Sequence, residues 1–400
     1  MLFLSTLFFA GLYCLYALGI CASSGLIAHR LLAVDRSDMP PDQTVRLAVS
    51  DFLLGCGFGP WCLGLIQLTF LVVLGGLPPL FLAGCSLVMA AAGLYALRDQ
   101  IREVVGACRE LVWHDQGSRL GATLVLAAVV VVVAFSLRAA VIPLWHGDTL
   151  IYAYEAKALR DGGGYEYRLG HTPTPNARNY IRKNDHPLTY IGTMVSGLSF
   201  SPSRDQDLSL RLALQLQNVL LVLVLLGLGL RLGGPVGVLA PILLLFAYGF
   251  GALIDMAHRE AFRIIPVLLC LGFLPETGRR LRLRSSRVAL LFASMLFLWN
   301  AHTGSIVVAP LVVACQILVL RDWRSRGLVA AIFLLGFLLG ANHLLDSYLK
   351  TGDPLGFEFP PQAKLTRIAP PKLWHPTPPP PPRWPPCGSG SPTSGRETAD

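Results

Sequence analysis

Apolar residues along this chain come in long uninterrupted blocks, and not at the spacing of one helix face or in the alternation of a strand. A helix that crosses a bilayer needs about 20 predominantly apolar residues. The pattern therefore predicts an all-α polytopic membrane protein with about ten transmembrane helices and one large outward loop. The expected spans are residues 4–28, 51–75, 78–97, 120–144, 209–230, 235–254, 261–275, 288–301, 304–320 and 327–345.

Arginines between the blocks predict the orientation. With the N-terminus outside, the inward connections hold sixteen arginines, whereas the short outward connections hold only Arg259 and Arg263. This asymmetry agrees with the enrichment of Lys and Arg on the cytoplasmic side of membrane proteins. The first block has no Lys or Arg before Arg30, which favours a first transmembrane helix over a cleaved signal peptide.

Composition supports the membrane interpretation and excludes nucleic acid as a partner. Hydrophobic residues make up 53% of the 400 residues and charged residues 14%, whereas a soluble chain carries roughly a quarter charged residues. The net charge of +9 comes from arginines between apolar blocks, where membrane orientation explains them. The nine cysteines show no CxxC pair and no zinc-binding spacing, so we interpret them as small apolar residues of helices.

Three regions follow from this pattern. Residues 1–119 contain three spans and an inward loop, and residues 120–346 form a membrane core that includes the outer loop 146–208. Residues 347–400 form an outer segment whose end is Pro-rich and then Ser/Gly-rich, with no means of building a core. We expect this tail to be disordered. A polyproline spacer, a shifted reading frame and a truncated product all remain open as its origin.

The outer loop 146–208 is far longer than the other connections. Loops beyond about 15 residues are usually functional or disordered, and the tyrosines and alternating charges of this one favour an ordered loop with short helices. The stretch TLIYAYEAKALR has helical spacing that would bring Leu150, Tyr154, Lys157 and Ala158 near one face, and Asp148 or Thr149 could cap it.

Acids, histidines and arginines recur on the outward side, while the opposite side is nearly all arginine. Ionisable groups at a membrane boundary are costly and often functional, and Asp148 follows directly on a span. A one-sided set of this kind suits an enzyme that works at the outer surface. The other candidate residues are Tyr152, Glu155, Lys157, Arg178, Arg182, His186, Asp255, Arg259, Glu260, Arg263 and His302.

Two motifs carry a family resemblance. The stretch GDTLIYAYEAKAL, followed some residues later by NDHPLTYIGTMV, resembles the first outer loop of the GT-C glycosyltransferases. That superfamily includes protein mannosyltransferases and the aminoarabinose transferases of lipid A. Asp148 takes the place of the family's catalytic acid, and the residues from His186 to Leu188 match a His-Pro-Pro-Leu-like patch. The similarity covers roughly residues 120–350, and it departs from the family at Thr149, where many relatives have Glu.

The resemblance implies transfer of a sugar from a polyprenyl-phosphate donor to a glycan, lipid or protein acceptor. Independently, such a donor already carries a good leaving group, so the acceptor hydroxyl needs a general base, and Asp148 is placed to supply it. Arginine suits the departing phosphate because its planar fork binds two oxygens; the candidates are Arg178, Arg182, Arg259 and Arg263. Tyr152, Lys157, His186 and His302 are candidate substrate contacts. Glu155, Asp255 and Glu260 are candidates for a second acid, and hard oxygen ligands would suit Mg or Mn, although no ligand pattern requires a metal.

Two other functions remain open, a transporter and a polymerase or ligase of lipid-linked polysaccharide. A transporter would fit less well because the sequence shows no internal repeat and few ionisable residues in mid-span. The expected partners are membrane lipid, donor and acceptor. The predominance of Arg over Lys hints at GC-rich coding, and hence at a bacterial inner membrane with the active face toward the periplasm.

Overall fold

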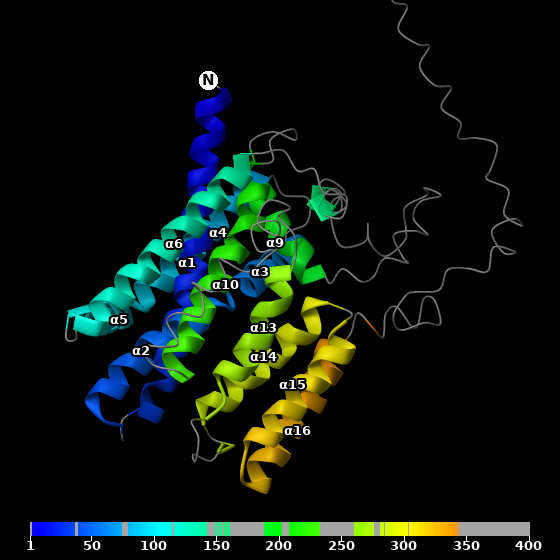
Figure 1. Cartoon of the computed structure of the whole chain (residues 1–400). Helices are drawn as coiled ribbons and strands as arrows, with labels where there is room; N and C mark the ends of the chain where they lie inside the picture. Colours follow the sequence, from blue (N-terminus) through cyan, green and yellow to red (C-terminus); the bar gives the residue numbers. More distant parts are fainter. Residues whose placement is uncertain are drawn as a thin grey trace, which may run out of the picture. The chain divides into compact units, whose positions relative to one another are not determined.

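The computed structural model describes the chain as a set of helices (Figure 1). The described residues are 2–36, 39–73, 79–113, 116–141, 149, 152–153, 156–157, 159–160, 188–201, 208–232, 260–275, 281–283, 285–302, 304–341 and 344. No strand occurs within these ranges, which confirms the all-α prediction. The helices are α1 Leu2–Arg36, α2 Pro41–Cys56, α3 Gly59–Val73, α4 Pro79–Ala96, α5 Arg98–Trp113, α6 Gln116–Val141, α9 Leu188–Leu198, α10 Leu208–Leu232, α13 Glu260–Gly272, α14 Ser286–Ala301, α15 Ser305–Val319 and α16 Trp323–Gly340.

Four helices of the described part are long and apolar enough to cross a membrane, or five if one bent pair counts as a single span. The count of about ten is not confirmed. The four candidates are Leu4–Val34, Gln43–Leu71, Leu208–Leu232 and Trp323–Gly340, and the bent pair is Leu80–Ala96 with Arg98–Leu111. The apolar helices Val129–Val141, Ser286–Ala301 and Ser305–Val319 are shorter. The expected span 235–254 and the tail 347–400 lie outside the described residues.

The second candidate span begins earlier than the hydrophobic pattern predicts. Its helix α2 starts at Pro41 and α3 continues it after a turn at Gly57, so that the candidate span is Gln43–Leu71 and not 51–75. Proline suits the first turn of a helix because its missing N–H would have no partner there. Asp51, expected at the edge of the span, therefore lies well inside the helix and is buried.

Two segments predicted as connections contain helices. Helix α5 occupies most of the expected inward connection 98–119 and bends away from α4 by 67°. One face of α5, with Val104 and Cys108, packs against the other helices, while Ile101 and Val105 are exposed. The expected outer loop 146–208 contains α9. The described residues between 149 and 160 are also helical, in agreement with the predicted short helix.

Helix α9 approaches α3 closely because both helices carry a glycine at the contact. A Cβ atom built on Gly64 would lie 2.1 Å from the carbonyl oxygen of Thr189, and one built on Gly192 would lie 2.6 Å from the carbonyl oxygen of Gly64. Small residues let two helix backbones pack at short distance. The Oγ1 atom of Thr193 donates to the carbonyl oxygen of Pro60 at 2.8 Å, which adds a polar contact across the pair.

We expect Gly64→Ala to separate α3 from α9 and to lower the unfolding free energy by about 1–3 kcal/mol, the usual cost of overpacking a filled contact. Thermal unfolding of the detergent-purified protein measures the effect. Gly84→Ala in α4 is the matched control, because a Cβ atom there meets nothing within 4 Å. Equal unfolding temperatures for the two variants would contradict the close approach.

Candidate functional site

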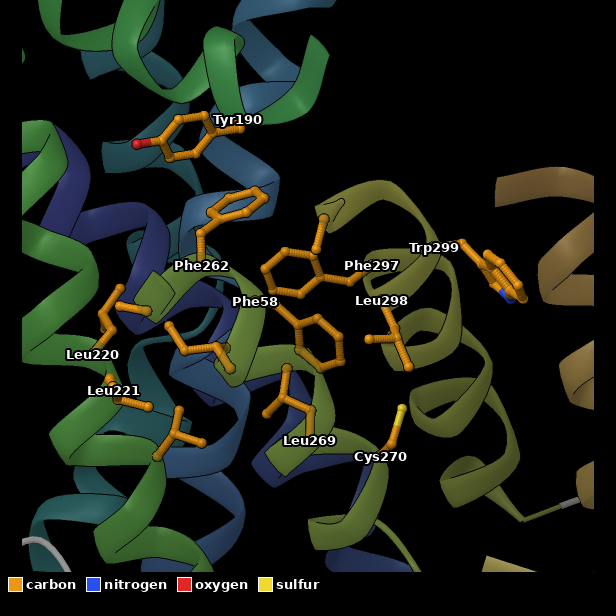
Figure 2. Close-up of a cluster of buried hydrophobic side chains, with 14 of the residues drawn as sticks. Phe58, Tyr190, Leu220, Leu221, Phe262, Leu269, Cys270, Phe297, Leu298 and Trp299 are labelled. Carbon is orange, nitrogen blue, oxygen red and sulfur yellow. The ribbon is translucent and has the colours of Figure 1, made fainter. Parts of the chain in front are cut away.

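The start of α9, the start of α13 and the end of α14 meet around a group of aromatic rings (Figure 2). The ring of Tyr190 lies 5.4 Å from that of Tyr152 and 5.2 Å from that of Phe262. Phe262 in turn lies 5.0 Å from Phe297. All four side chains are almost fully buried. Segments far apart in the sequence therefore converge beside the stretch that follows Asp148.

Polar contacts occur at the ends of the same helices. The Oγ1 atom of Thr189 donates to the carbonyl oxygen of Asn300 at 3.0 Å, which ties α9 to the end of α14. At the start of α13, Nη1 of Arg263 donates to Oε1 of Glu260 at 2.5 Å. A carboxylate in the first turn of a helix is stabilised by the helix dipole. The Nδ1 atom of His302 accepts from the backbone N–H of Gly304 at 2.7 Å, in the turn between α14 and α15.

The structure places some of the predicted site residues and leaves the others outside the described part. Tyr152, Glu260, Arg263 and His302 lie on or next to the elements that converge here, and the half-buried Lys157 is also helical. Tyr152 is only 1% exposed, so its ring is part of the packing. Asp148, Glu155, Arg178, Arg182, His186, Asp255 and Arg259 lie outside the described residues.

A metal site receives no support from the described residues. No three His, Cys, Asp or Glu side chains among them are grouped so that they could hold a metal ion. Glu260, the one described candidate for a second acid, is paired with Arg263, and this positive charge opposes cation binding at its carboxylate. The expectation of Mg or Mn between Asp148 and a second acid remains a prediction.

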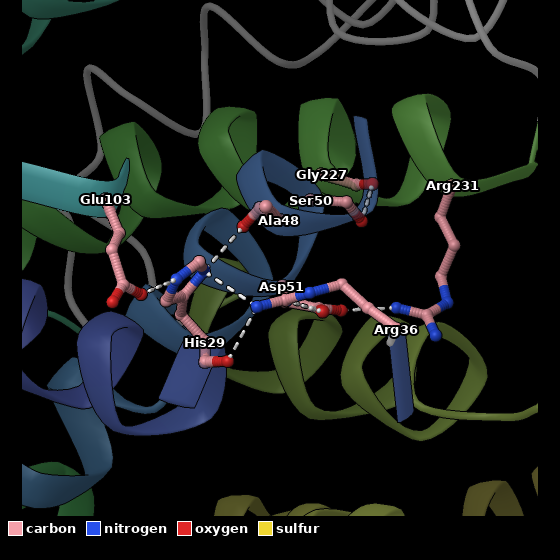
Figure 3. Close-up of polar contacts among 8 residues, drawn as sticks. All are labelled: His29, Arg36, Ala48, Ser50, Asp51, Glu103, Gly227 and Arg231. Carbon is pink, nitrogen blue, oxygen red and sulfur yellow. Dashed lines mark hydrogen bonds and ion pairs between the residues drawn. The ribbon is translucent and has the colours of Figure 1, made fainter. Parts of the chain in front are cut away.

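The sequence did not predict a second polar cluster, which joins α1, α2 and α10 (Figure 3). The two carboxylate oxygens of Asp51 accept from different arginines, Oδ2 from Arg36 at 2.5 Å and Oδ1 from Arg231 at 2.6 Å. The side chains of all three residues are at most 5% exposed. The sequence feature that could have predicted this cluster is Asp51 itself, because an acid beside or within an apolar block needs an opposite charge when it is buried.

His29 connects this ion cluster to α5. Its Nδ1 atom lies 3.3 Å from both Nη2 of Arg36 and the carbonyl oxygen of Ala48, and its Nε2 atom lies 3.3 Å from Oε2 of Glu103. Arginine only donates, so a bond from Arg36 requires a lone pair on Nδ1. The proton then sits on Nε2 and is donated to Glu103. This tautomer satisfies two of the three contacts and joins four helices through one network.

The position of the ion cluster favours a structural role. Arg36 is the last residue of α1 and Arg231 the last but one of α10, so the charges lie near helix ends. Buried ionisable residues of transporters mark a pathway through the membrane interior. Here Asp51, Arg36 and Arg231 are instead paired directly with one another, which suits a fixed connection between helices.

No protein-family model matches the chain, and no curated protein and no solved structure is significantly similar to it.

Proposed function

We propose that this chain transfers a sugar from a polyprenyl-phosphate donor to an acceptor at the end of the helices where α9, α13 and α14 meet. The observation that supports the proposal is that Tyr152, Glu260, Arg263 and His302, four residues selected from the sequence, lie on or next to the elements whose rings meet at Tyr190. The resemblance of that stretch to the GT-C glycosyltransferases adds the substrate class. The outward orientation of this end rests on the distribution of arginines along the sequence.

In the proposed reaction Asp148 accepts the proton of the acceptor hydroxyl while the oxygen attacks the anomeric carbon. The bond from that carbon to the phosphate oxygen breaks, and the polyprenyl phosphate leaves with the bonding electrons. Arg263 contributes positive charge near the departing phosphate. A guanidinium has five N–H donors in a fork, so one arginine can serve Glu260 and a phosphate at once. The apolar helices would hold the lipid chain beside the site.

We expect Arg263→Lys to weaken the donor interaction, because lysine keeps the positive charge and loses the planar fork. The KM for the donor should rise about tenfold, the loss of one charge-assisted hydrogen bond, while the rate at saturating donor changes less. Arg102→Lys is the matched control, since Arg102 is 82% exposed on α5 and its ion pair is with Asp99 of the same helix. An unchanged KM in Arg263→Lys would remove this residue from donor binding.

Membranes with and without the chain, supplied with labelled polyprenyl-phosphate sugars, test the proposed function. We expect chain-dependent movement of label from the lipid into a product that no longer carries the polyprenol. Release of label across the membrane without a new covalent product would indicate a transporter. Elongation of an existing lipid-linked glycan would indicate the polymerase or ligase. Either result, or no chain-dependent change with any donor, would overturn the proposal.

A further inference from the structure

The side-chain amide of Gln217 is buried but makes no hydrogen bond to the described part of the chain. The residue is 1% exposed, in the middle of α10. Neither its Oε1 nor its Nε2 atom has a hydrogen-bond partner within the described part of the chain. A buried amide without partners lowers the stability of a protein, so its presence calls for a reason. Nearby Gln215 differs, because its Oε1 accepts from Nδ2 of Asn218 at 3.0 Å.

Helix geometry places Gln217 at the level of Phe262. Ser209 of α10 lies against Gly197 near the end of α9, and Phe262 of α13 lies against Tyr190 near its start. Figure 2 shows that α10, from Leu220 to Leu221, and α13, from Phe262 to Leu269, run in the same direction. Further along, side chains of Val224 and Leu269 both reach the turn at Gly57.

Val224 and Leu269 are therefore at the same level. Gln217 precedes Val224 by seven residues on α10, and Phe262 precedes Leu269 by seven residues on α13, which is about 10 Å along each helix. Residues seven apart lie on nearly the same face of a helix, so Gln217 is on the side of α10 that carries Val224. Leu221, one turn further along, belongs to the same face and lies in the apolar cluster with Phe262 and Leu269 (Figure 2). Gln217 is therefore at about the level of the aromatic group of the candidate site, on the face of α10 that carries Leu221.

We infer that Gln217 binds two neighbouring hydroxyl groups of the donor's sugar. An amide offers one acceptor and one donor side by side, and both remain unused here. Adjacent sugar hydroxyls match this pair, since one can donate to Oε1 and the other can accept from Nε2. A phosphate matches less well because it can only accept. This inference rests on the proposed function and adds the group that recognises the sugar.

Ligand-induced stabilisation tests the inference with two probes, a polyprenyl phosphate and the same lipid carrying one hexose or one aminopentose. For the wild type we expect each lipid to raise the unfolding temperature, and the sugar-bearing lipid to bind more tightly. In Gln217→Leu the sugar should no longer improve binding, a loss of about tenfold for two neutral hydrogen bonds. The unliganded variant should unfold at a higher temperature than the wild type, because an unpaired buried amide has been removed.

Gln215→Leu is the matched control on the same helix. It leaves Asn218 without its partner, so it should lower the unfolding temperature and keep the preference for the sugar-bearing lipid. An undiminished preference in Gln217→Leu would overturn the inference and leave the proposed function standing. If neither lipid stabilises the wild type, the proposed function fails and the inference fails with it.

Discussion

Asp51→Asn is expected to lower the unfolding free energy by about 3–5 kcal/mol, the usual cost of removing one partner from a buried ion pair. Asparagine has nearly the same shape as aspartate but no charge, so Arg36 and Arg231 would both keep a buried positive charge without its counter-ion. These three residues belong to α1, α2 and α10, so the substitution should weaken the packing between these helices. Chemical or thermal unfolding of the purified protein measures it.

Asp99→Asn controls for the substitution itself. Asp99 is 69% exposed and its ion pair with Arg102 is 3.7 Å long. The change in unfolding free energy caused by Asp99→Asn should therefore be close to zero. Replacing Arg36, Asp51 and Arg231 together by apolar residues of similar size should recover much of the stability, because no uncompensated charge is then buried. A triple variant as unstable as Asp51→Asn, or a stable Asp51→Asn, would contradict the counter-ion explanation.

Asp148→Asn is expected to reduce sugar transfer by about 100-fold or more, the usual contribution of a positioned general base. The asparagine amide cannot accept the proton of the acceptor hydroxyl, while the donor should still bind. The effect is therefore expected in the rate at saturating donor and much less in the KM. Initial rates of transfer over a range of donor concentrations separate the two quantities.

The control for this variant is its own unfolding temperature, which should equal that of the wild type. Transfer that falls together with stability would indicate a structural role for Asp148. A rise of the donor KM at an unchanged maximal rate would assign Asp148 to binding, and the proposed role as base would then be wrong.

Hydrophobic pattern alone predicted the helical class and the approximate place of most described helices. It failed where a polar side chain is compensated by tertiary contacts. The pattern predicts Asp51 at the edge of a span, but its two arginines allow it to lie inside one. The pattern predicts a connection where α5 lies, because the segment carries more charges than a span, although its residues have the amphipathic spacing of a helix that lies at a membrane surface.

The arginine count also combined two roles. Arg36 and Arg231 contribute to the arginine asymmetry that predicts the membrane orientation, and both also donate to the buried carboxylate of Asp51. At the candidate site, the motif NDHPLTYIGTMV contains Tyr190, but the pattern predicts a loop there, because an eleven-residue helix inside a long polar segment has a weak signal. The sequence does not predict a role for Gln217, because such a role depends on the packing of α10 beside α13.

Sugar transfer by the purified chain in liposomes, with a labelled polyprenyl-phosphate sugar and no other enzyme, tests the central claim most directly. We expect the wild type and Asp99→Asn to transfer label at equal rates and Asp148→Asn to be at least about 100-fold slower. Equal rates in all three proteins, or no transfer by the wild type with any donor, would contradict the claim.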